Sequence, residues 1–340
     1  MVENDNRQIA IACQGGGSHT AFTAGVLKKL LREKEKHDYE VVALSGTSGG
    51  AICALLAWYA LLTDGATKAA GLLDSFWRDN SANSYGDRLL NDWLLWANRF
   101  FENTGGAPTV SPYLYPSWGQ DLLKSMLQER VDFERLRELV KPTSPVLLVG
   151  AVNVLSGEFK AFRSHNFVGD GSRVFNDSQI DGISVEAILA SAAIPTLFRA
   201  TSIGKDVYWD GLFSQNPPVR ELPDAMPDEI WVIQINPEKY RSEPKSMPQI
   251  MDRRNDLSGN LSLYQETYFI KTINKWIQDG SLSGTKHKVI EVKWIQMLRE
   301  LSAESKLNRD PSFIREMMAY GEEQTEKFLR EPVEADRRAT

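Results

Sequence analysis

The stretch from Val41 to Ala57 constrains the fold of this 340-residue chain more than any other. An apolar run of strand length leads into GTSGG at residues 46–50, and good helix formers follow. A serine on a sharp strand-to-helix turn, with glycines two residues before and after it, matches the G-x-S-x-G nucleophile elbow. Gly46 and Gly50 are those glycines, and the turn puts Ser48 at a helix N-terminus, which favours negative charge. The alternative is a Gly/Ser turn without chemistry.

A second glycine-rich loop lies near the N-terminus. The apolar run Ile9–Cys13 is followed by QGGGSHT at residues 14–20, and then by a predicted helix over Ala21–Arg32. His19-Thr20 does not supply the G-K-[ST] of a phosphate-binding P-loop, and Thr20 stands where a dinucleotide loop needs its last glycine. An oxyanion hole needs only free backbone N–H groups, which Gly15, Gly16 and Gly17 would offer with little steric obstruction. A tight turn without function is the plainer alternative.

Strands and helices are predicted to alternate along the chain, which indicates an α/β fold with a largely parallel sheet and helices on both faces. We expect one domain, a catalytic unit over residues 5–300 with a peripheral helical segment of the same domain over residues 301–340. The strands expected after the elbow are Pro145–Val154, Glu158–Arg163, Val207–Trp209, Ile230–Asn236 and Val289–Ile295. The helices expected after Thr63 are Asp64–Asn80, Leu89–Phe101, Ser117–Leu127, Asp132–Val140, Val185–Ala193, Ser246–Gly280 with a break near Ser258-Gly259, and Pro311–Arg330.

Composition narrows the function classes. A net charge of −6, without a basic stretch, argues against a nucleic-acid partner. Cys13 and Cys53 lie in apolar segments and are expected to be core residues, so neither a disulfide framework nor a metal site is indicated. There is no signal-peptide pattern and no apolar run long enough to span a membrane, so we expect a cytoplasmic protein.

The segment from Leu89 to Phe101 allows two interpretations. Its apolar residues recur at helical spacing, with tryptophan and phenylalanine beside asparagine and arginine. A stripe of this width is usually part of a core. It also fits a lid helix or a helix that makes peripheral contact with a membrane.

A serine nucleophile needs a base within hydrogen-bonding reach. None of the four histidines, His19, His37, His165 and His287, has the apolar setting expected of a triad member. An order of Ser48, Asp210 and His287 would still match that of α/β-hydrolases. Asp210 acting directly is the alternative, because it ends a short strand, is followed by glycine, and would become a better base if partly buried. An ordinary Asp-Gly turn is the interpretation without chemistry.

Four blocks of the sequence together resemble the patatin-like phospholipases. They are GGGSHTAFTAGVL, GTSGG, ASAAIPTLF at residues 190–198, and Trp209-Asp210-Gly211 followed by Asn216-Pro217. The resemblance implies a three-layer α/β/α sandwich and a Ser-Asp dyad. By motif position, Ser48 would be the nucleophile, Asp210 the general base, and the amides of Gly15, Gly16 and Gly17 the oxyanion hole.

This chain departs from the family pattern at two positions of the glycine loop. The family usually reads GGG-x-[R/K]-G, whereas His19 and Thr20 stand at the last two positions here. The change puts in doubt any role of the basic residue in recognising a phosphate head group. His19 and Gly49 remain candidates for lining the site.

The resulting hypothesis is a serine lipid acyl hydrolase of phospholipase A or lysophospholipase type, needing no metal and no other cofactor. The alternatives are an esterase, thioesterase or triacylglycerol lipase on the same scaffold, and a lipid-binding scaffold without turnover. A nucleotide-binding protein is the weakest rival. The substrate partner would be a lipid or another acyl ester, and the sequence does not set the oligomeric state.

Overall fold

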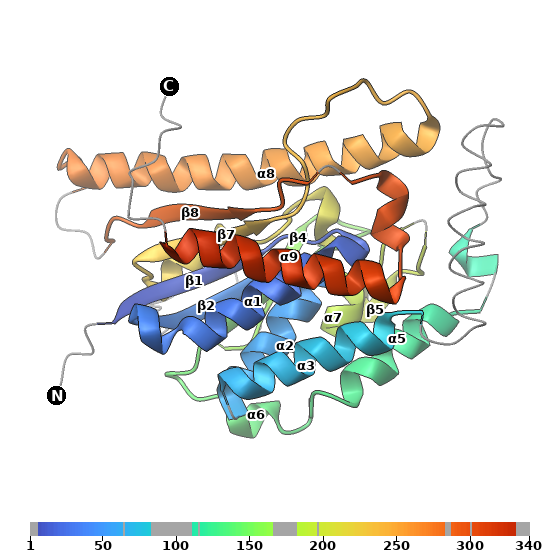
Figure 1. Cartoon of the computed structure of the whole chain (residues 1–340), viewed down its shortest axis with the longest axis horizontal. Helices are drawn as coiled ribbons and strands as arrows, with labels where there is room; N and C mark the ends of the chain where they lie inside the picture. The colour runs from blue at the N-terminus through green and yellow to red at the C-terminus, as the bar shows by residue number, and fades with distance from the viewer. Residues whose placement is uncertain are drawn as a thin grey trace.

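The computed structural model describes residues 6–63, 65–82, 111–114, 116–165, 182–195, 197–282, 287–299 and 301–330. Its centre is a mixed sheet with strand order β5-β6-β3-β2-β1-β7-β8 and β4 also paired to β3 (Figure 1). The strands are β1 Arg7–Cys13, β2 Tyr39–Thr47, β3 Val146–Asn153, β4 Phe159–Arg163, β5 Thr201–Ile203, β6 Asp206–Asp210, β7 Glu229–Gln234 and β8 Glu291–Gln296.

Five neighbouring strands, from β3 through β2, β1 and β7 to β8, are parallel. The sheet then reverses direction, because β6 pairs antiparallel with β3 and β5 antiparallel with β6. A largely parallel sheet was predicted, and it is confirmed. The reversal matters for the site, since it brings the end of β6 back beside the parallel strands.

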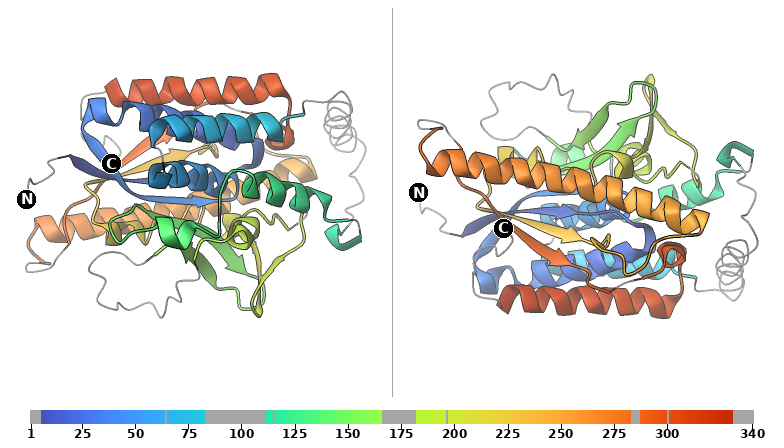
Figure 2. Two further views of the ribbon diagram at one scale, coloured as in Figure 1. Left: turned by 90° about the horizontal axis from the view of Figure 1, so that it is seen from below. Right: turned by 90° about the horizontal axis from the view of Figure 1, so that it is seen from above.

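Helices cover both faces of the sheet, so the chain forms three layers (Figure 2). On one side lie α1 Ala21–Glu33, α2 Gly49–Thr63, α3 Ala66–Asn80 and α9 Pro311–Arg330, and on the other lies α8 Met247–Gln278. Strand β1 shows how the sequence feeds both cores. Ile9, Ile11 and Cys13 enter the larger one, whereas Ala10 and Ala12 face the smaller one under α8, as the period of two in a strand requires.

Most predicted elements are present, with two corrections among the helices. Helices α5 Trp118–Gln128 and α7 Val185–Ser191 lie close to their predicted bounds. The helix expected over Asp132–Val140 is wrong in extent, since only the four residues of α6 Leu136–Leu139 are helical. The break expected near Ser258-Gly259 is also wrong, because α8 runs without interruption for 32 residues. Gly259 instead lets α8 approach the Asn216 side chain, 3.3 Å from where a Cβ would stand.

The structure does not test two of the sequence-based predictions. Residues 89–101 fall outside the described residues. The division into residues 5–300 and 301–340 of one domain stays a proposal. Among the helices that the structure does describe, none has the length and apolar character needed to cross a membrane.

Helix α9 is charged on its outer side and packs closely on α1. Ile314 and Met317 are buried in the larger core. The two helix backbones meet through paired glycines, since a Cβ on Gly25 would lie 1.9 Å from the carbonyl oxygen of Met318, and one on Gly321 would lie 2.1 Å from that of Phe22. The contact therefore requires glycine on both helices.

We predict that Gly321→Ala lowers the free energy of unfolding by about 1–3 kcal/mol, because α9 must shift to admit the methyl group. Gly71→Ala is the matched control: Gly71 is also helical, in α3, and a Cβ there meets nothing within 4 Å. The control should stabilise by up to about 1 kcal/mol, since alanine is the better helix former. Chemical denaturation measures both, and equal effects would show that the glycine contact does not matter.

Candidate active site

Ser48 sits in a strained turn between β2 and α2, as the elbow motif predicts. Its φ is +57°, one of only three positive values among the non-glycine residues that the structure describes. Such a conformation disfavours side chains with a Cβ. A Cβ on Gly46 would lie 2.6 Å from the backbone of Gly50 and Ala51, and one on Gly50 would lie 2.3 Å from the carbonyl oxygen of Cys13. A side chain at either position would clash with these backbone atoms, so both positions require glycine.

The N-terminal glycine loop lies directly against this turn. A Cβ on Gly15 would stand 2.7 Å from Cβ of Ser48 and 2.3 Å from the carbonyl oxygen of Thr47. The loop follows β1, which is paired with β2, so the ends of two adjacent parallel strands bring the two motifs together. Gly49, a predicted lining residue, packs under the loop, because a Cβ there would meet Oγ1 of Thr20 at 2.2 Å.

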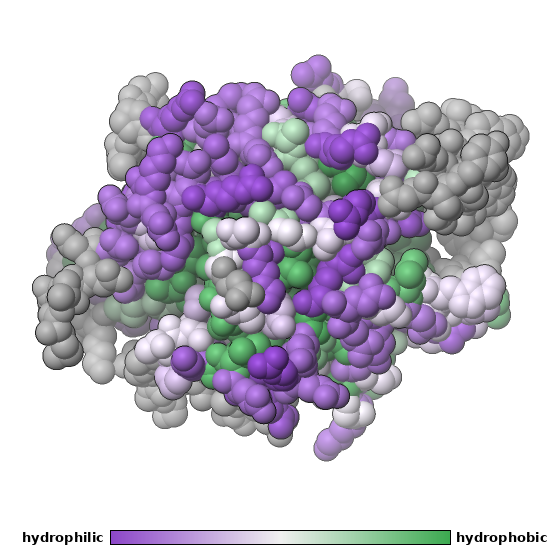
Figure 3. All heavy atoms as spheres, turned by 60° about the horizontal axis from the view of Figure 1, so that its bottom comes forward, coloured by the Kyte–Doolittle hydropathy of each residue, from purple (hydrophilic) through white to green (hydrophobic). Residues whose placement is uncertain are grey.

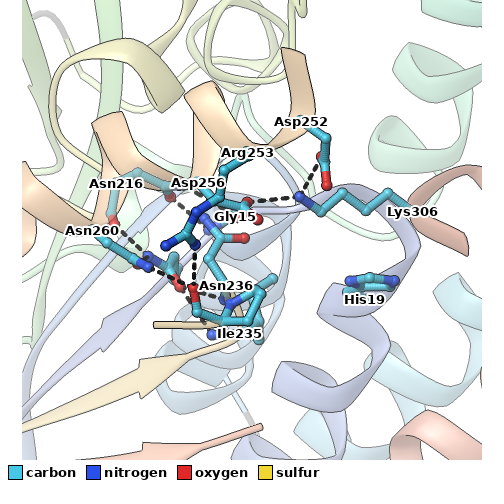
Figure 4. A network of polar contacts seen from close by, with 12 residues as sticks. Gly15, His19, Asn216, Ile235, Asn236, Asp252, Arg253, Asp256, Asn260 and Lys306 are labelled. Atoms are coloured by element: carbon cyan, nitrogen blue, oxygen red, sulfur yellow. Dashed lines mark hydrogen bonds and ion pairs between the residues drawn. The ribbon is translucent and has the colours of Figure 1, made fainter. Parts of the chain in front are cut away.

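The three glycine amides do not have the same surroundings. The amide of Gly15 donates to Oδ1 of Asn216 at 2.6 Å, and Nδ2 of Asn216 donates back to the Gly15 carbonyl at 3.2 Å (Figure 4). Gly15 is thus already paired, in contrast to the role that the motif predicts for its amide. The amides of Gly16 and Gly17 have no acceptor among the described residues.

Asp210 arrives at the same place through the reversed part of the sheet. Thr47 pairs with Gly150 across β2 and β3, and the next residue, Ala151, pairs with Asp210 across β3 and β6. The end of β6 therefore lies one strand away from the end of β2. The Ser48 hydroxyl is close enough to the Asp210 carboxyl to favour its charged form and so lower its pKa, but the contact is looser than a full hydrogen bond.

The Asp210 carboxyl is fully buried, which changes its acidity. Oδ1 accepts a hydrogen bond of 2.9 Å from the amide of Leu212, whereas Oδ2 has no hydrogen-bond partner among the residues that the structure describes. Burial raises the pKa of Asp210 to about 7, against the opposing effects of the Ser48 hydroxyl and the Leu212 amide. A carboxyl with this pKa can accept a proton near neutral pH, as a general base must.

His19 and His287 are held away from Asp210. His19 is buried and its Nε2 lies 2.7 Å from Oγ of Ser305. Burial, helped by the charge of Lys306, lowers the pKa of His19 to about 3, so the ring is neutral at pH 7. His287 precedes β8 and lies at the opposite edge of the parallel strands from Ser48. The triad of Ser48, Asp210 and His287 is therefore wrong.

Ser191 is a site residue that sequence reasoning did not identify. Its hydroxyl, at the end of α7 and fully buried, accepts a 2.9 Å hydrogen bond from the amide of Ser48. Two residues later the carbonyl of Ala193 accepts from the amide of Asp210 at 3.0 Å. One short segment thus holds the backbones of both residues. The only signal in the sequence was the ASAAIPTLF block, which resembles the family pattern but does not by itself assign a role to Ser191.

Further contacts to the glycine loop come from the C-terminal third of the chain. The segment η6 Ala303–Leu307 lies on the loop, because a Cβ on Gly17 would be 2.3 Å from the carbonyl oxygen of Lys306. Nζ of Lys306 is held at 2.7 Å from carboxylates of both Asp252 and Asp256 on α8 (Figure 4). The charge pair anchors η6 and, through it, the loop.

Comparison with known proteins identifies the family of this chain. The family model of patatin-like phospholipase matches residues 11–223, more than half of the chain. The chain belongs to the patatin-like phospholipase family. No curated protein is significantly similar to it in sequence.

The solved structures that are similar to this patatin-like chain include two named bacterial proteins. VipD from Legionella pneumophila is 13% identical with a TM-score of 0.43, over 95% of this chain and 67% of VipD. The type III effector protein ExoU, known from Pseudomonas aeruginosa, is 14% identical with a TM-score of 0.38, over 94% of this chain and 52% of ExoU. Both similarities are remote, and this chain spans about half the length of ExoU.

We predict that Ser191→Ala slows covalent labelling of Ser48 by a fluorophosphonate about tenfold, because the Ser48 amide loses a buried acceptor that helps hold the strained turn. Ser191→Thr, which keeps the hydroxyl, should restore part of the rate. Ser45→Ala is the matched control, since Ser45 is a buried serine of β2 whose hydroxyl has no hydrogen-bond partner in the described part of the chain. If both alanine variants slow labelling equally, Ser191 does not position Ser48.

A second prediction concerns stability and pH. The pKa of Asp210 is raised from 3.8 to about 7. Between pH 3.8 and pH 7 the Asp210 carboxyl is therefore protonated in the folded protein but ionised in the unfolded chain. Stability therefore falls as the pH rises through this range. Asp210→Asn should raise the melting temperature at pH 8, and the gain should shrink towards pH 4. Asp206→Asn, an exposed change on the same strand, should show no such trend; a matching trend there contradicts the assignment.

Proposed function

We propose that this protein is a serine acyl hydrolase of lipid esters, of phospholipase A or lysophospholipase type. The observation that carries the proposal is the meeting of three groups at one sheet edge. They are a serine in a strained elbow, a buried carboxyl with a pKa near 7, and two unpaired loop amides. Family membership supports the lipid substrate class.

The proposed reaction uses Asp210 twice. Its carboxylate takes the proton from Oγ of Ser48 while Oγ attacks the ester carbonyl carbon. Collapse of the tetrahedral intermediate breaks the ester bond, and Asp210 returns the proton to the departing alcohol. Asp210 then takes a proton from water, whose oxygen attacks the carbonyl carbon of the acyl-enzyme. As the bond to Ser48 breaks and the fatty acid leaves, Asp210 returns this proton to Oγ and restores the Ser48 hydroxyl.

The negative charge on the carbonyl oxygen is assigned to the amides of Gly16 and Gly17. Neither amide has an acceptor within the described ranges, which leaves both donors available, whereas the Gly15 amide is hydrogen-bonded to Asn216. Loss of one such donor typically costs about 3 kcal/mol in the barrier. The N-terminus of α2, which begins at Gly49, adds a favourable dipole beside Ser48.

One observation favours a second candidate, the hydrolysis of esters without phosphate recognition at the loop corner. His19 is neutral at pH 7 and faces Ser305, and Thr20 is fully buried against Gly49. Neither residue offers a cation to a head group. A triacylglycerol or a soluble ester would then be accepted as readily as a phospholipid.

We predict that Ser48→Ala and Asp210→Asn each lower fatty-acid release from phosphatidylcholine or lysophosphatidylcholine at least about a thousandfold, as expected for members of one catalytic unit. Ser48→Ala should also abolish fluorophosphonate labelling. The controls Ser45→Ala and Asp206→Asn should retain activity.

The choice of substrate distinguishes the two proposed functions. Release from either phospholipid supports the first proposal, and the ratio distinguishes phospholipase from lysophospholipase. Turnover of triacylglycerol or a short soluble ester alone supports the second. A folded wild-type protein whose Ser48 resists labelling would contradict both and favour a lipid-binding scaffold.

A further inference from the structure

Helix α8 exposes apolar side chains along its whole length. The structure describes 16 exposed large apolar residues, and seven of them lie on this helix, so the surface is concentrated there. They are Met247, Ile250, Leu257, Leu261, Tyr268, Phe269 and Trp276, between 42% and 72% exposed. The helix runs across the outside of the molecule in the view from above (Figure 2). In Figure 3, which shows a different face, polar residues predominate.

The two sides of α8 reverse the pattern usual for a surface helix. Its buried side contacts the smaller core through Leu263 and Ile270 but also buries the polar residues Asp256, Asn260 and Thr267. A helix that faced only water would carry its polar residues outside. An outward face with several aromatic and aliphatic side chains needs a partner.

The charged side chains of α8 are also divided between its two sides, with cations on the outward side and carboxylates turned inward. Arg254, Lys271 and Lys275 are exposed. The carboxylates of Asp252 and Asp256 pair inward with Lys306, and Glu266 accepts hydrogen bonds from the amides of Val219 and Arg220. Among the described side chains within α8, the outward face therefore carries cations and no carboxylate, although the chain as a whole has a net charge of −6. The exposed carboxylate of Asp279, the residue after the helix, interacts with Lys275.

The apolar face continues to the candidate site. Oγ of Ser258 donates a 2.9 Å hydrogen bond to the carbonyl of Phe213. Phe213 belongs to the turn η4 Gly211–Phe213, whose first residue follows Asp210, and its ring is 38% exposed. A lipid surface resting on α8 would thus lie alongside the turn that begins at Asp210.

We propose that the outward face of α8, together with Phe213, docks on an anionic lipid bilayer. Cations with aromatic and aliphatic side chains and no carboxylate are the composition of a helix that lies in a membrane interface. Two copies packed symmetrically through this face would bring its cations close to one another, which disfavours a dimer through α8. The inference deepens the proposed function and rests on it for the lipid nature of the substrate.

The test uses vesicle binding by Ser48→Ala protein, which leaves the lipid intact. It should bind mixed phosphatidylcholine–phosphatidylglycerol vesicles more tightly than pure phosphatidylcholine vesicles. Adding Leu261→Gln with Tyr268→Gln should weaken binding at least about tenfold, since two apolar contacts are lost. Leu155→Gln with Leu298→Gln, more exposed residues on other surfaces, is the matched control and should bind normally. Equal binding by both double variants overturns the proposal.

A second measurement does not depend on these substitutions. Both native cysteines are buried, so Tyr268→Cys can be labelled selectively with an environment-sensitive fluorophore. Emission should shift to the blue with anionic vesicles, and a label at Leu155→Cys should not shift. A shift only at position 155, or at neither, contradicts docking through α8. Dimerisation that is abolished by the α8 variant, without vesicle binding, also overturns the proposal.

Hydrolysis of a short soluble ester separates this surface from the proposed function. Without the Ser48→Ala change, the α8 double variant should turn over the soluble ester normally but hydrolyse vesicle lipid at least about tenfold more slowly. Vesicle binding through α8 without hydrolysis of any ester would retain the surface and reject the proposed function. Normal vesicle hydrolysis by the α8 double variant would retain the proposed function and reject the docking surface.

Discussion

The left-handed backbone of Ser48 is the constraint on which the rest of this structure depends. A side chain in that conformation costs about 1–2 kcal/mol, so the surroundings must hold it. Gly46 and Gly50 let three backbones approach within contact distance, Gly15 lies against Ser48 itself, and Ser191 accepts its amide hydrogen. Strands β1 and β2 and helices α2 and α7 are all required for this one turn, which explains why the blocks occur together.

The mixed topology of the sheet follows from the need to bring a carboxyl to the same edge. A further parallel strand beside β3 would end there as well, but only after another crossover. The antiparallel β6 instead follows β5 directly, pairs with β3 and ends in Asp210, opposite Ala151. The cost is a buried carboxyl whose pKa is raised to about 7. The same burial that makes Asp210 a base also lowers the free energy of unfolding above about pH 7.

Local signals explain what could be predicted from the sequence. Glycines around Ser48, the triple glycine and the strand before Asp210 act within a few residues, so their elements were found close to the right bounds. Ser191 and Asn216 were missed in their roles because each contacts a backbone 143 or 201 residues away. Gly259 misled the prediction for α8, since it serves packing against Asn216, which the sequence alone does not show.

The departure of His19 from the family pattern can be understood through the C-terminal third of the chain. Oγ of Ser305 donates to the carbonyl of Ser302, so Nε2 of His19 must carry the proton that it shares with Ser305. Burying a basic side chain in this place would cost free energy, and Lys306 already pairs with the carboxylates of Asp252 and Asp256. Residues beyond the family match at 11–223 thus cover the glycine loop, and the price of that support is a neutral residue where the family has a cation.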